Sequence, residues 1–330
     1  MRLKAVVILL CILACSAIRA SEIALTISPS HVLPGLPTSL HVVIASTDHR
    51  DIVVPNHALL RVVPVSGEPF LAEWGSSQEH PLAHATLPET GGMHGLGAVI
   101  HGKREFIFRA DDLGHPAWFA DPRLNTPGTY RLQLLLVKDV DEGSLSRARA
   151  LDLGFDSPGM LMSTEAILTV DQPRGDDAQL WKQLVSLTRG NSSVWSPRWW
   201  SPLDAHEFAK SALRFPASPY TAYAVPYFAS PNPEERASAL EKVLEAQPST
   251  PIKDNLELQL GETEVSAAQN ALSGPRPTVK RAIELYDRAR TRFETLERNA
   301  ADPDIKTRSQ EDRERLPTPD EIRHSAASAH

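Results

Sequence analysis

The sequence predicts a two-domain chain that is all-β in its first half and all-α in its second half. Three observations indicate this fold class. Apolar and polar residues alternate in short runs up to Val170, helical spacing replaces the alternation from Gly175, and an apolar leader precedes both halves. We therefore expect four segments: a signal peptide at 1–20, a β domain at 21–172, a helical domain at 173–300 and a disordered charged tail at 301–330.

The first twenty residues have the composition of a secretory signal peptide. Arg2 and Lys4 precede an apolar run, residues 5–12, which is too short to span a bilayer, and small residues follow it. We expect an exported protein that is periplasmic or associated with the cell envelope. The stretch before Cys15 also resembles a bacterial lipobox, which leaves two alternatives: cleavage after Ala20, or lipidation of Cys15 and attachment to the outer membrane.

Cysteine content and charge exclude several classes of function. Cys11 and Cys15 both lie in the leader, so cleavage after Ala20 leaves no thiol for a disulfide or for catalysis. Three of the 34 Lys and Arg residues lie in the leader, and the other 31 stand against 41 acidic residues, a formal net charge of −10. Because such a chain repels the phosphate backbone, nucleic acid is excluded as a partner.

Alternating runs separated by turn residues predict short antiparallel strands in the first half. The run at 22–27 is followed by several Pro and Gly residues, and alternation resumes at 39–44. Further candidate strands are 59–63, 104–109, 129–137 and 165–170. With six or seven strands, a β-sandwich fits this pattern best.

The β domain contains three stretches that share a pattern with a known family. They are Leu33-Pro34-Gly35-Leu36-Pro37 before a strand, Pro127-Gly128-Thr129-Tyr130-Arg131-Leu132, and the closing Ile167-Leu168-Thr169-Val170. Together they resemble an immunoglobulin-like domain of bacterial exported proteins, over residues 22–171. The resemblance implies a structural role for Tyr130, which in that family buries its ring at a corner and directs its hydroxyl group to backbone groups.

Residues 70–102 depart from the strand pattern and contain several histidines, which are His80, His84, His94 and His101. Long loops inside compact domains are often functional. His80 and His84 lie one helical turn apart, and imidazole suits zinc or copper. No Asp, Glu or Cys accompanies them at a ligand spacing, so a polar surface loop is the alternative to a metal site.

Helical periodicity begins at Gly175 and predicts amphipathic helices over 178–188 and 205–213. The predicted helix starts share a polar capping residue followed by proline, whose missing N–H is tolerated in the first turn. These pairs are Ser201-Pro202, Ser218-Pro219, Asn232-Pro233 and Thr250-Pro251. Glu235, three residues after Asn232, completes the pattern of a capping box. The second half is therefore expected to contain several short packed helices.

The helix starts also repeat along the chain. The segment 215–219 aligns with 247–251 at a spacing of 32 residues, close to the 34 residues of tetratricopeptide units. Small and aromatic residues match that family's packing positions at Leu260-Gly261, Ala282, Tyr286 and Ala289. Residues 203–298 thus resemble tetratricopeptide-like repeats, which implies two or three stacked hairpins with a peptide-binding groove. The alternative is a helical bundle that only packs on the sandwich.

Tryptophan gathers at the junction of the two domains, at Trp181, Trp195, Trp199 and Trp200. If Trp195, Trp199 and Trp200 are exposed, they offer stacking surfaces for sugar rings or contacts for a protein partner. If they are buried, they lock the two domains together.

The tail that follows Ala301 is charged and almost without aromatic residues, a composition typical of disorder. Its segment 307–315 has no apolar stripe with which a helix could dock.

Sequence patterns typical of enzymes are missing: Gly-x-Ser-x-Gly, His-Glu-x-x-His and Gly-x-x-x-x-Gly-Lys do not occur. We therefore expect a non-enzymatic exported adapter or scaffold, without a cofactor, that binds another envelope protein or peptide through a helical-repeat groove. Two alternatives stay open: a carbohydrate-binding or enzyme-accessory protein that uses the junction tryptophans, and a metal-assisted hydrolase that uses the four histidines. Contact with a membrane is expected only through a lipid anchor on Cys15.

Overall fold

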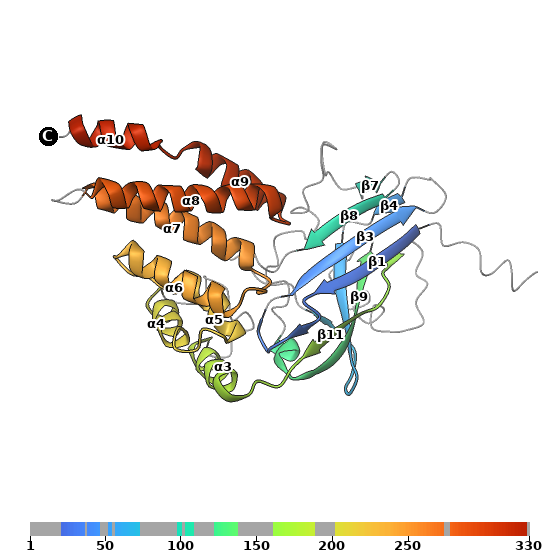
Figure 1. Cartoon of the computed structure of the whole chain (residues 1–330). Coiled ribbons are helices and arrows are strands. Elements are labelled where there is room, and N and C mark those ends of the chain that lie inside the picture. The colour runs from blue at the N-terminus through green and yellow to red at the C-terminus, as the bar shows by residue number, and fades with distance from the viewer. Residues whose placement is uncertain are drawn as a thin grey trace, which may run out of the picture. The chain divides into compact units, whose positions relative to one another are not determined.

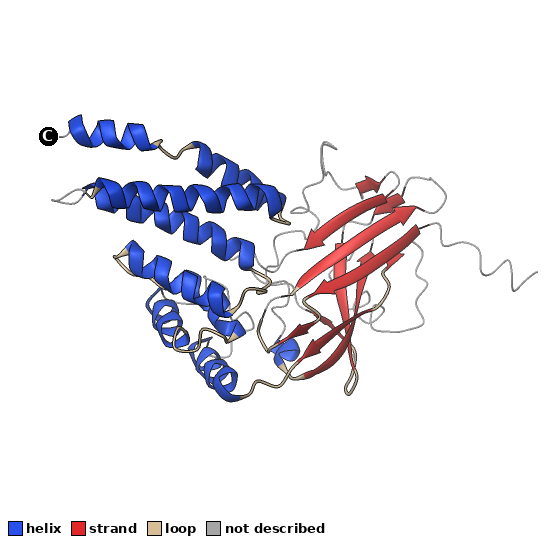
Figure 2. Ribbon diagram, in the orientation of Figure 1, coloured by secondary structure: helices blue, strands red, loops and turns tan. Residues whose placement is uncertain are grey.

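A computed structural model describes residues 21–36, 38–46, 52–54, 57–72, 98–100, 103–108, 122–137, 161–188, 202–273 and 278–328. These residues form two compact units, one built mainly of strands and one of helices (Figure 1 and Figure 2). The helical unit begins at Gln172 and also takes in the segment Leu33–Leu36. The predicted signal peptide lies outside the described residues.

The described part of the strand unit contains three sheets. The first has the order β1-β3-β8, with β1 (Ser21–Ser28), β3 (Ser39–Ser46) and β8 (Lys103–Phe108). The second has the order β2-β11-β9-β5-β6, and β10 also pairs with β9. Its strands are β2 (His31–Val32), β11 (Ala166–Val170), β9 (Gly128–Val137), β5 (His57–Pro64), β6 (Phe70–Ala72) and β10 (Leu161–Met162). The third pairs β4 (Ile52–Val54) with β7 (Ala98–Ile100), and every pair except β2 with β11 is antiparallel.

Alternation along the strands produces the core of this unit. Ile23 and Leu25 on β1 are each 3% exposed, and Leu132 on β9 is fully buried. Because successive side chains of a strand point to opposite faces, an alternating run buries one complete face. The six strands predicted from alternation are confirmed. The other described strands have two or three residues, which is too short for a period to be visible in the sequence.

Tyr130, at the start of β9, has the structural role expected of it. Its side chain is 4% exposed, and its hydroxyl group donates to Thr126 O at 2.5 Å. Arg123 O, a second acceptor, lies 3.1 Å from the same hydroxyl oxygen. Burial raises the pKa of this hydroxyl, which keeps it a hydrogen-bond donor. The bond ties the end of the 3-10 helix η1 (Pro122–Asn125) to the strand that follows it.

The described part of the helical unit has eight α-helices and one 3-10 helix. They are α3 (Gly175–Thr188), α4 (Pro202–Ala212), α5 (Pro219–Ala224), η2 (Val225–Tyr227), α6 (Pro233–Ala246), α7 (Lys253–Ser273), α8 (Val279–Asn299), α9 (Pro303–Glu314) and α10 (Pro319–Ser328). α7 packs against α6, α8 and α9, and α8 packs against α9 and α10, so consecutive helices stack (Figure 1). No described helix combines the length and apolarity needed to span a bilayer.

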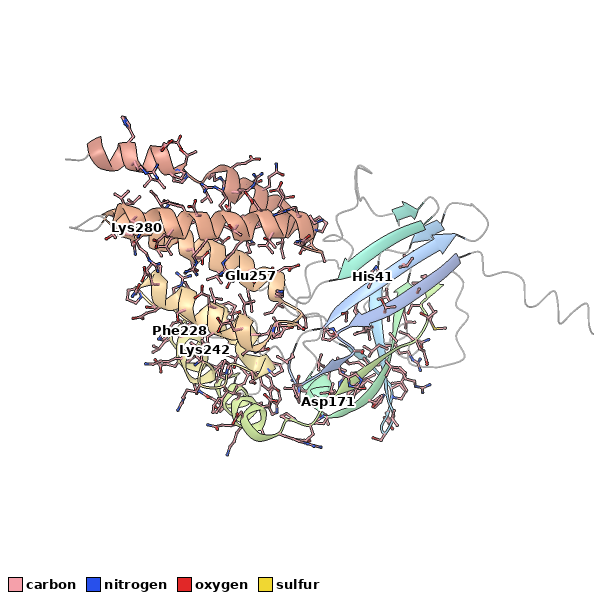
Figure 3. All side chains as sticks on the ribbon, in the orientation of Figure 1. His41, Asp171, Phe228, Lys242, Glu257 and Lys280 are labelled. Carbon is pink, nitrogen blue, oxygen red and sulfur yellow. The ribbon has the colours of Figure 1, made fainter. Side chains whose placement is uncertain are left out.

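Side chains also link the earlier helices of this unit. The ring of Phe228, just after η2, stacks on His206 of α4 with ring centroids 5.5 Å apart, and His206 Nδ1 accepts from Ala229 N at 3.1 Å. Lys242 on α6 donates to Leu213 O at 3.1 Å, which joins α6 to the end of α4. Figure 3 labels Phe228 and Lys242 among the described side chains.

The capping residue of α6 is confirmed, and the expected capping box is modified. Asn232 accepts a hydrogen bond from Glu234 N at 3.0 Å through its side chain. Glu235 does not reach back to Asn232 directly. Its carboxylate accepts from Ser230 Oγ at 2.7 Å, and Ser230 Oγ accepts from Asn232 N at 3.1 Å, so Ser230 completes the link.

Two other predicted caps are wrong in detail. Ser218 precedes α5, but its hydroxyl group donates to Asp177 Oδ1 at 2.5 Å instead of accepting from the helix. Thr250 does not cap α7, because the chain first makes a turn and the helix begins at Lys253. Ser201 lies outside the described residues.

The prediction of a disordered tail at 301–330 is wrong for its described part, which forms α9 and α10. Ile305 is 5% exposed and belongs to one apolar cluster of the helical unit, and Ile322 is 3% exposed and belongs to a second. Leu316, which lies between them in the sequence, packs against both clusters. The prediction failed because it required a continuous apolar stripe. Single apolar side chains at wide intervals are enough when α7 and α8 already supply a large apolar surface.

Both tail helices begin with the same pairing of a capping residue and proline that starts α6. The side chain of Asp302 accepts from Asp304 N at 2.8 Å. Thr318 and Glu321 form a reciprocal capping box: Thr318 N donates to Glu321 Oε2 at 2.7 Å, and Glu321 N donates to Thr318 Oγ1 at 3.3 Å. The hydrogen bonds from Thr318 lower the pKa of the Glu321 carboxyl.

Gly261 marks the closest approach of α7 and α8. A Cβ atom at this position would lie 2.5 Å from Phe293 Cε1 and 2.9 Å from Cζ. Phe293 is fully buried and packs with Leu258 and Ala289, so its ring has little room to move away. The small residue expected at Gly261 therefore has a steric cause.

Gly261→Ala is expected to lower the free energy of unfolding by about 1–3 kcal/mol, the usual cost of overpacking a core. At an unhindered helical position the same change raises stability by about 0.5–1 kcal/mol, so the sign of the effect is diagnostic. Urea denaturation followed by circular dichroism measures it. Adding Phe293→Leu should relieve the clash, so the double variant should lose less stability than the two single losses together; a stabilising Gly261→Ala contradicts the close approach.

The lowered pKa of Glu321 predicts an acid-sensitive start of α10. A carboxylate whose pKa falls on folding stabilises the fold at pH values above its unfolded pKa, and that contribution is lost as the pH falls through the folded pKa. Glu321→Ala should remove this part of the pH dependence, measured from the helix-sensitive NMR shifts of Ile322. Asp320→Ala, which leaves the Thr318 bonds intact, is the control and should titrate like the wild type. Identical titrations of wild type and Glu321→Ala would contradict the capping box.

Candidate functional site

The site residues expected from the sequence cannot be compared with the structure, because all of them lie outside the described residues. They are Cys15, His80, His84, His94, His101, Trp195, Trp199 and Trp200, and their roles stay predictions. Trp181 is described: it is partly buried on α3, and its ring stacks on the buried Tyr220 with centroids 6.1 Å apart. Within the described part of the chain, no group of three His, Cys, Asp or Glu side chains could hold a metal ion.

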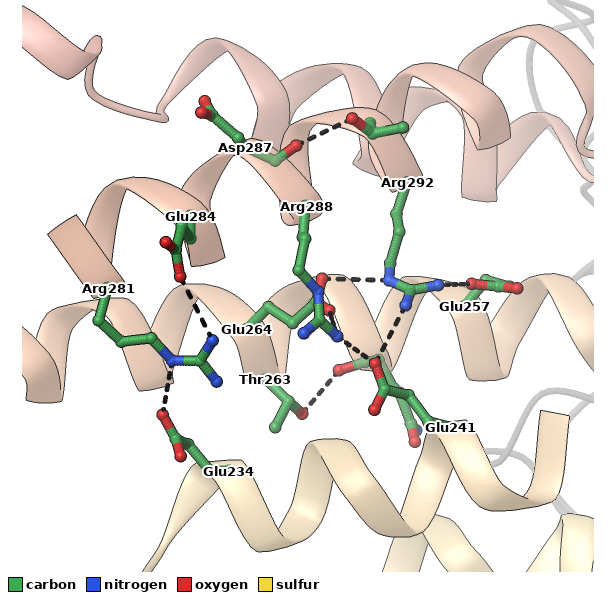
Figure 4. Close-up of polar contacts among 12 residues, drawn as sticks. Glu234, Glu241, Glu257, Thr263, Glu264, Arg281, Glu284, Asp287, Arg288 and Arg292 are labelled. Atoms are coloured by element: carbon green, nitrogen blue, oxygen red, sulfur yellow. Dashed lines mark hydrogen bonds and ion pairs between the residues drawn. The ribbon is translucent and has the colours of Figure 1, made fainter. Parts of the chain in front are cut away.

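A cluster of five charged side chains lies where α6, α7 and α8 meet (Figure 4). This charged cluster consists of Glu241 on α6, Glu257 and Glu264 on α7, and Arg288 and Arg292 on α8. The two arginines lie one helical turn apart and the two α7 glutamates two turns apart, so each pair shares one helix face. Packing α8 on α7 therefore brings two guanidinium groups to three carboxylates.

Glu264 is the centre of the charged cluster. Its side chain is fully buried; Oε1 lies 2.5 Å from Arg288 Nη2, and Oε2 accepts from Arg292 Nε at 3.1 Å. Arg292 also donates to Glu257 Oε2 at 2.6 Å, and its Nη2 lies 3.5 Å from Glu241 Oε1. Arg288 pairs with Glu241 as well. Glu241 thus connects α6 to both arginines of α8.

Burial and charge act in opposite directions on this cluster. Burial raises the pKa of Glu264, and the attraction of Arg292 and Arg288 offsets only part of that rise. For Arg292, burial lowers the pKa, but Glu264 and Glu257 outweigh it and raise the pKa. The arginine therefore stays charged, and Glu264 takes up a proton at a higher pH than an ordinary glutamate.

The geometry suits a structural clamp better than a catalytic centre. A guanidinium group cannot act as a base in a protein. Both carboxylate oxygens of Glu264 face an arginine, so neither is turned toward a space that a substrate could occupy. Separating a buried charge pair is costly, so the cluster holds one alignment of α6, α7 and α8.

Three more ion pairs join different helices of this unit. They are Arg281 with Glu234 (3.2 Å, α8 to α6), Arg308 with Glu262 (2.8 Å, α9 to α7) and Arg313 with Glu297 (3.0 Å, α9 to α8). Each is partly exposed and contributes little alone. Together with the charged cluster they connect α6, α7, α8 and α9 in a single register.

One face of α7 carries a row of polar side chains, which we call the α7 stripe: Gln259, Glu262, Ser266 and Asn270. They recur every three or four residues, and all are partly or fully exposed. Side-chain amides and hydroxyls can both donate and accept hydrogen bonds, which matches the needs of a peptide backbone. The α7 stripe is therefore a candidate contact surface on a helix that the charged cluster holds in place.

Sequence periodicity predicts the apolar face of α8 but not the charged cluster beside it. Ala282, Tyr286 and Ala289, expected at packing positions, are buried on α8, and Arg288 and Arg292 border this buried face. Charges at the border of an apolar stripe are usually solvated, so nothing in the pattern marks these two arginines as partners of a buried carboxylate. Glu264 lies 28 residues from Arg292, beyond the reach of any local spacing rule.

Compared with known proteins, the chain matches no family model and no curated protein.

Glu264→Ala tests the clamp. We expect a loss of about 3 kcal/mol in the free energy of unfolding, at the low end for a broken buried pair, because Arg288 and Arg292 keep Glu241 and Glu257 as partners. Urea denaturation at neutral pH measures the loss.

Asp287→Ala is the matched control for this test. Asp287 is exposed and pairs with Arg290 on its own helix at 2.6 Å, so its removal should change stability by less than about 0.5 kcal/mol. Equal losses in the two variants would show that Glu264 contributes no more than a surface charge.

Proposed function

We propose that this protein is a non-enzymatic exported adapter. In this proposal the strand unit is an immunoglobulin-like β-sandwich, and the helical unit is a short stack of tetratricopeptide-like hairpins that binds a protein of the cell envelope. The strand unit provides a rigid platform, and the helical unit provides the binding surface.

Two local features support the proposed folds. The buried Tyr130 and its hydrogen bond to Thr126 O have the form expected of the corner tyrosine in immunoglobulin-like domains. Pro219 and Lys253, the first residues of α5 and α7, lie 34 residues apart, which is the length of a tetratricopeptide unit. The interval from the start of α7 to the start of α9 is longer, because α7 and α8 have 21 residues each. The stack is therefore irregular.

The α7 stripe is the observation that carries the proposed function. It places the amides of Gln259 and Asn270 and the hydroxyl of Ser266 along a helix of 21 residues, while Glu262 between them pairs with Arg308 of α9. Polar side chains repeated along one helix face can follow an extended peptide without selecting for one large anchor. The charged cluster supports the same function, because a helix held in one alignment loses less conformational freedom when a partner binds.

The outer faces of α9 and α10 are also consistent with a stack that ends there. Ile305 and Ile322 are buried, and the side chains that the described residues of these two helices expose are mainly charged or polar. A terminal repeat needs such a face because no further hairpin covers it.

Affinity purification from the native envelope, with the full chain as bait, tests the proposal. The test variant combines Gln259→Arg with Asn270→Arg in the α7 stripe. We expect a partner protein that the wild type enriches to be reduced by about tenfold or more with this variant, since two bulky charges would occupy the contact surface.

The matched control places the same charges elsewhere, with Thr291→Arg and Thr295→Arg on the exposed side of α8. The control should enrich the partner as well as the wild type does. Calorimetry with the purified partner should give similar affinities for the wild type and the control, and a weaker affinity for the α7-stripe variant. Equal enrichment by all three baits, or equal loss in both variants, would remove the α7 stripe as the binding surface.

A further inference from the structure

Arg61 is an unusual residue for the middle of a strand. It lies on β5, is 3% exposed, and faces Gln133, its register partner on β9. Its Nη1 donates to Gln133 Oε1 at 2.6 Å, a bond between a cation and a neutral amide. Arginine is almost never this deeply buried without a carboxylate or phosphate to balance its charge.

One edge of this guanidinium group has no partner among the described residues. Arg61 Nε and Nη2 are both buried, and neither donates to any acceptor in the described part of the chain. These two nitrogens carry parallel N–H groups on the same side of the planar group. Their spacing matches the two oxygens of a carboxylate or a phosphate, which such an edge binds through two parallel hydrogen bonds.

Among the residues that the structure describes, the charges near Arg61 leave an excess of positive charge. Arg131 lies on the same face of β9 as Gln133, two residues away, and Glu165 lies 3.6 Å from Arg131 Nη1. Glu165 acts electrostatically on Arg61 as well, and it is the one carboxylate among the described residues found to do so. Burial lowers the pKa of Arg61, Glu165 opposes this, and Arg131 adds to it, as expected for a cation that is incompletely balanced.

We propose that the Nε–Nη2 edge of Arg61 binds an oxyanion from outside the chain, a carboxylate or a phosphate group. The carbonyl of Gln133 holds the opposite side of the guanidinium group and so aims the free edge. Arg131 and Glu165, which pair with each other at 3.6 Å, are both about half exposed. Leaving two buried donors unpaired costs free energy, and an anion that accepts from both removes that cost. The inference does not depend on the function proposed for the helical unit.

Arginine side-chain NMR on the full chain tests the site, because the Nε–Hε signal shifts when an oxyanion accepts from it. The protein is titrated separately with inorganic phosphate and with acetate, at constant ionic strength maintained with chloride. We expect one Nε–Hε signal, absent in Arg61→Lys, to shift in a saturable way. A response to phosphate alone assigns phosphoryl ligands, and a response to acetate alone assigns carboxylates.

Three variants make the test specific. Arg61→Lys keeps the charge but loses the paired donors and should weaken binding, read from the side-chain amide signals of Gln133, by about tenfold or more. Arg174→Lys changes an exposed arginine and should bind like the wild type. Arg61→Met should abolish binding and keep or raise the melting temperature without added anion, because it removes an unbalanced buried charge.

Four results would overturn the proposal. The first is the absence of a saturable shift with both anions. The second is unchanged binding in Arg61→Lys. The third is an Arg61 Nε–Hε chemical shift that does not change when anions are added but does change in Glu165→Gln, which would identify Glu165 as an internal partner. A clear fall in the melting temperature of Arg61→Met would likewise assign Arg61 a structural role.

Discussion

The helical unit depends on the contact between α7 and α8. Gly261 allows the two helices to approach until the ring of Phe293 fills the space that a side chain would need. One turn further along α7, the same closeness buries Glu264 between Arg288 and Arg292. A buried carboxylate is tolerable only because its partners are held on a helix that cannot move away, so the steric contact and the charge pairing require each other.

This coupling explains how a charged, weakly apolar sequence can keep several helices in register. The cluster reaches Glu241 on α6, and weaker pairs continue through Arg308 on α9. Surface pairs of this kind contribute little to stability one at a time, but they select one alignment among several that apolar packing alone would allow. A surface built from polar side chains, such as the α7 stripe, binds a partner well only if its side chains keep fixed positions.

Periodicity predicted the long strands and helices because their buried residues recur often enough to be visible in the sequence. The shortest strands escaped it, and so did α9 and α10, although Asp302-Pro303 and Thr318-Pro319 repeat the pair that starts α6. The buried charges could not be predicted. Glu264 and Arg61 have partners 28 and 72 residues away, and only tertiary packing turns an ordinary charged residue into a buried one.

Native-state hydrogen exchange of the amides in α6, α7 and α8 would test most directly whether these helices form one unit. We expect Leu240, Leu258 and Leu285, one buried leucine from each helix, to exchange with the same opening free energy and the same dependence on denaturant. Opening of α8 at a denaturant concentration where α6 stays protected would contradict the clamp, since the charged cluster would then not hold the helices together.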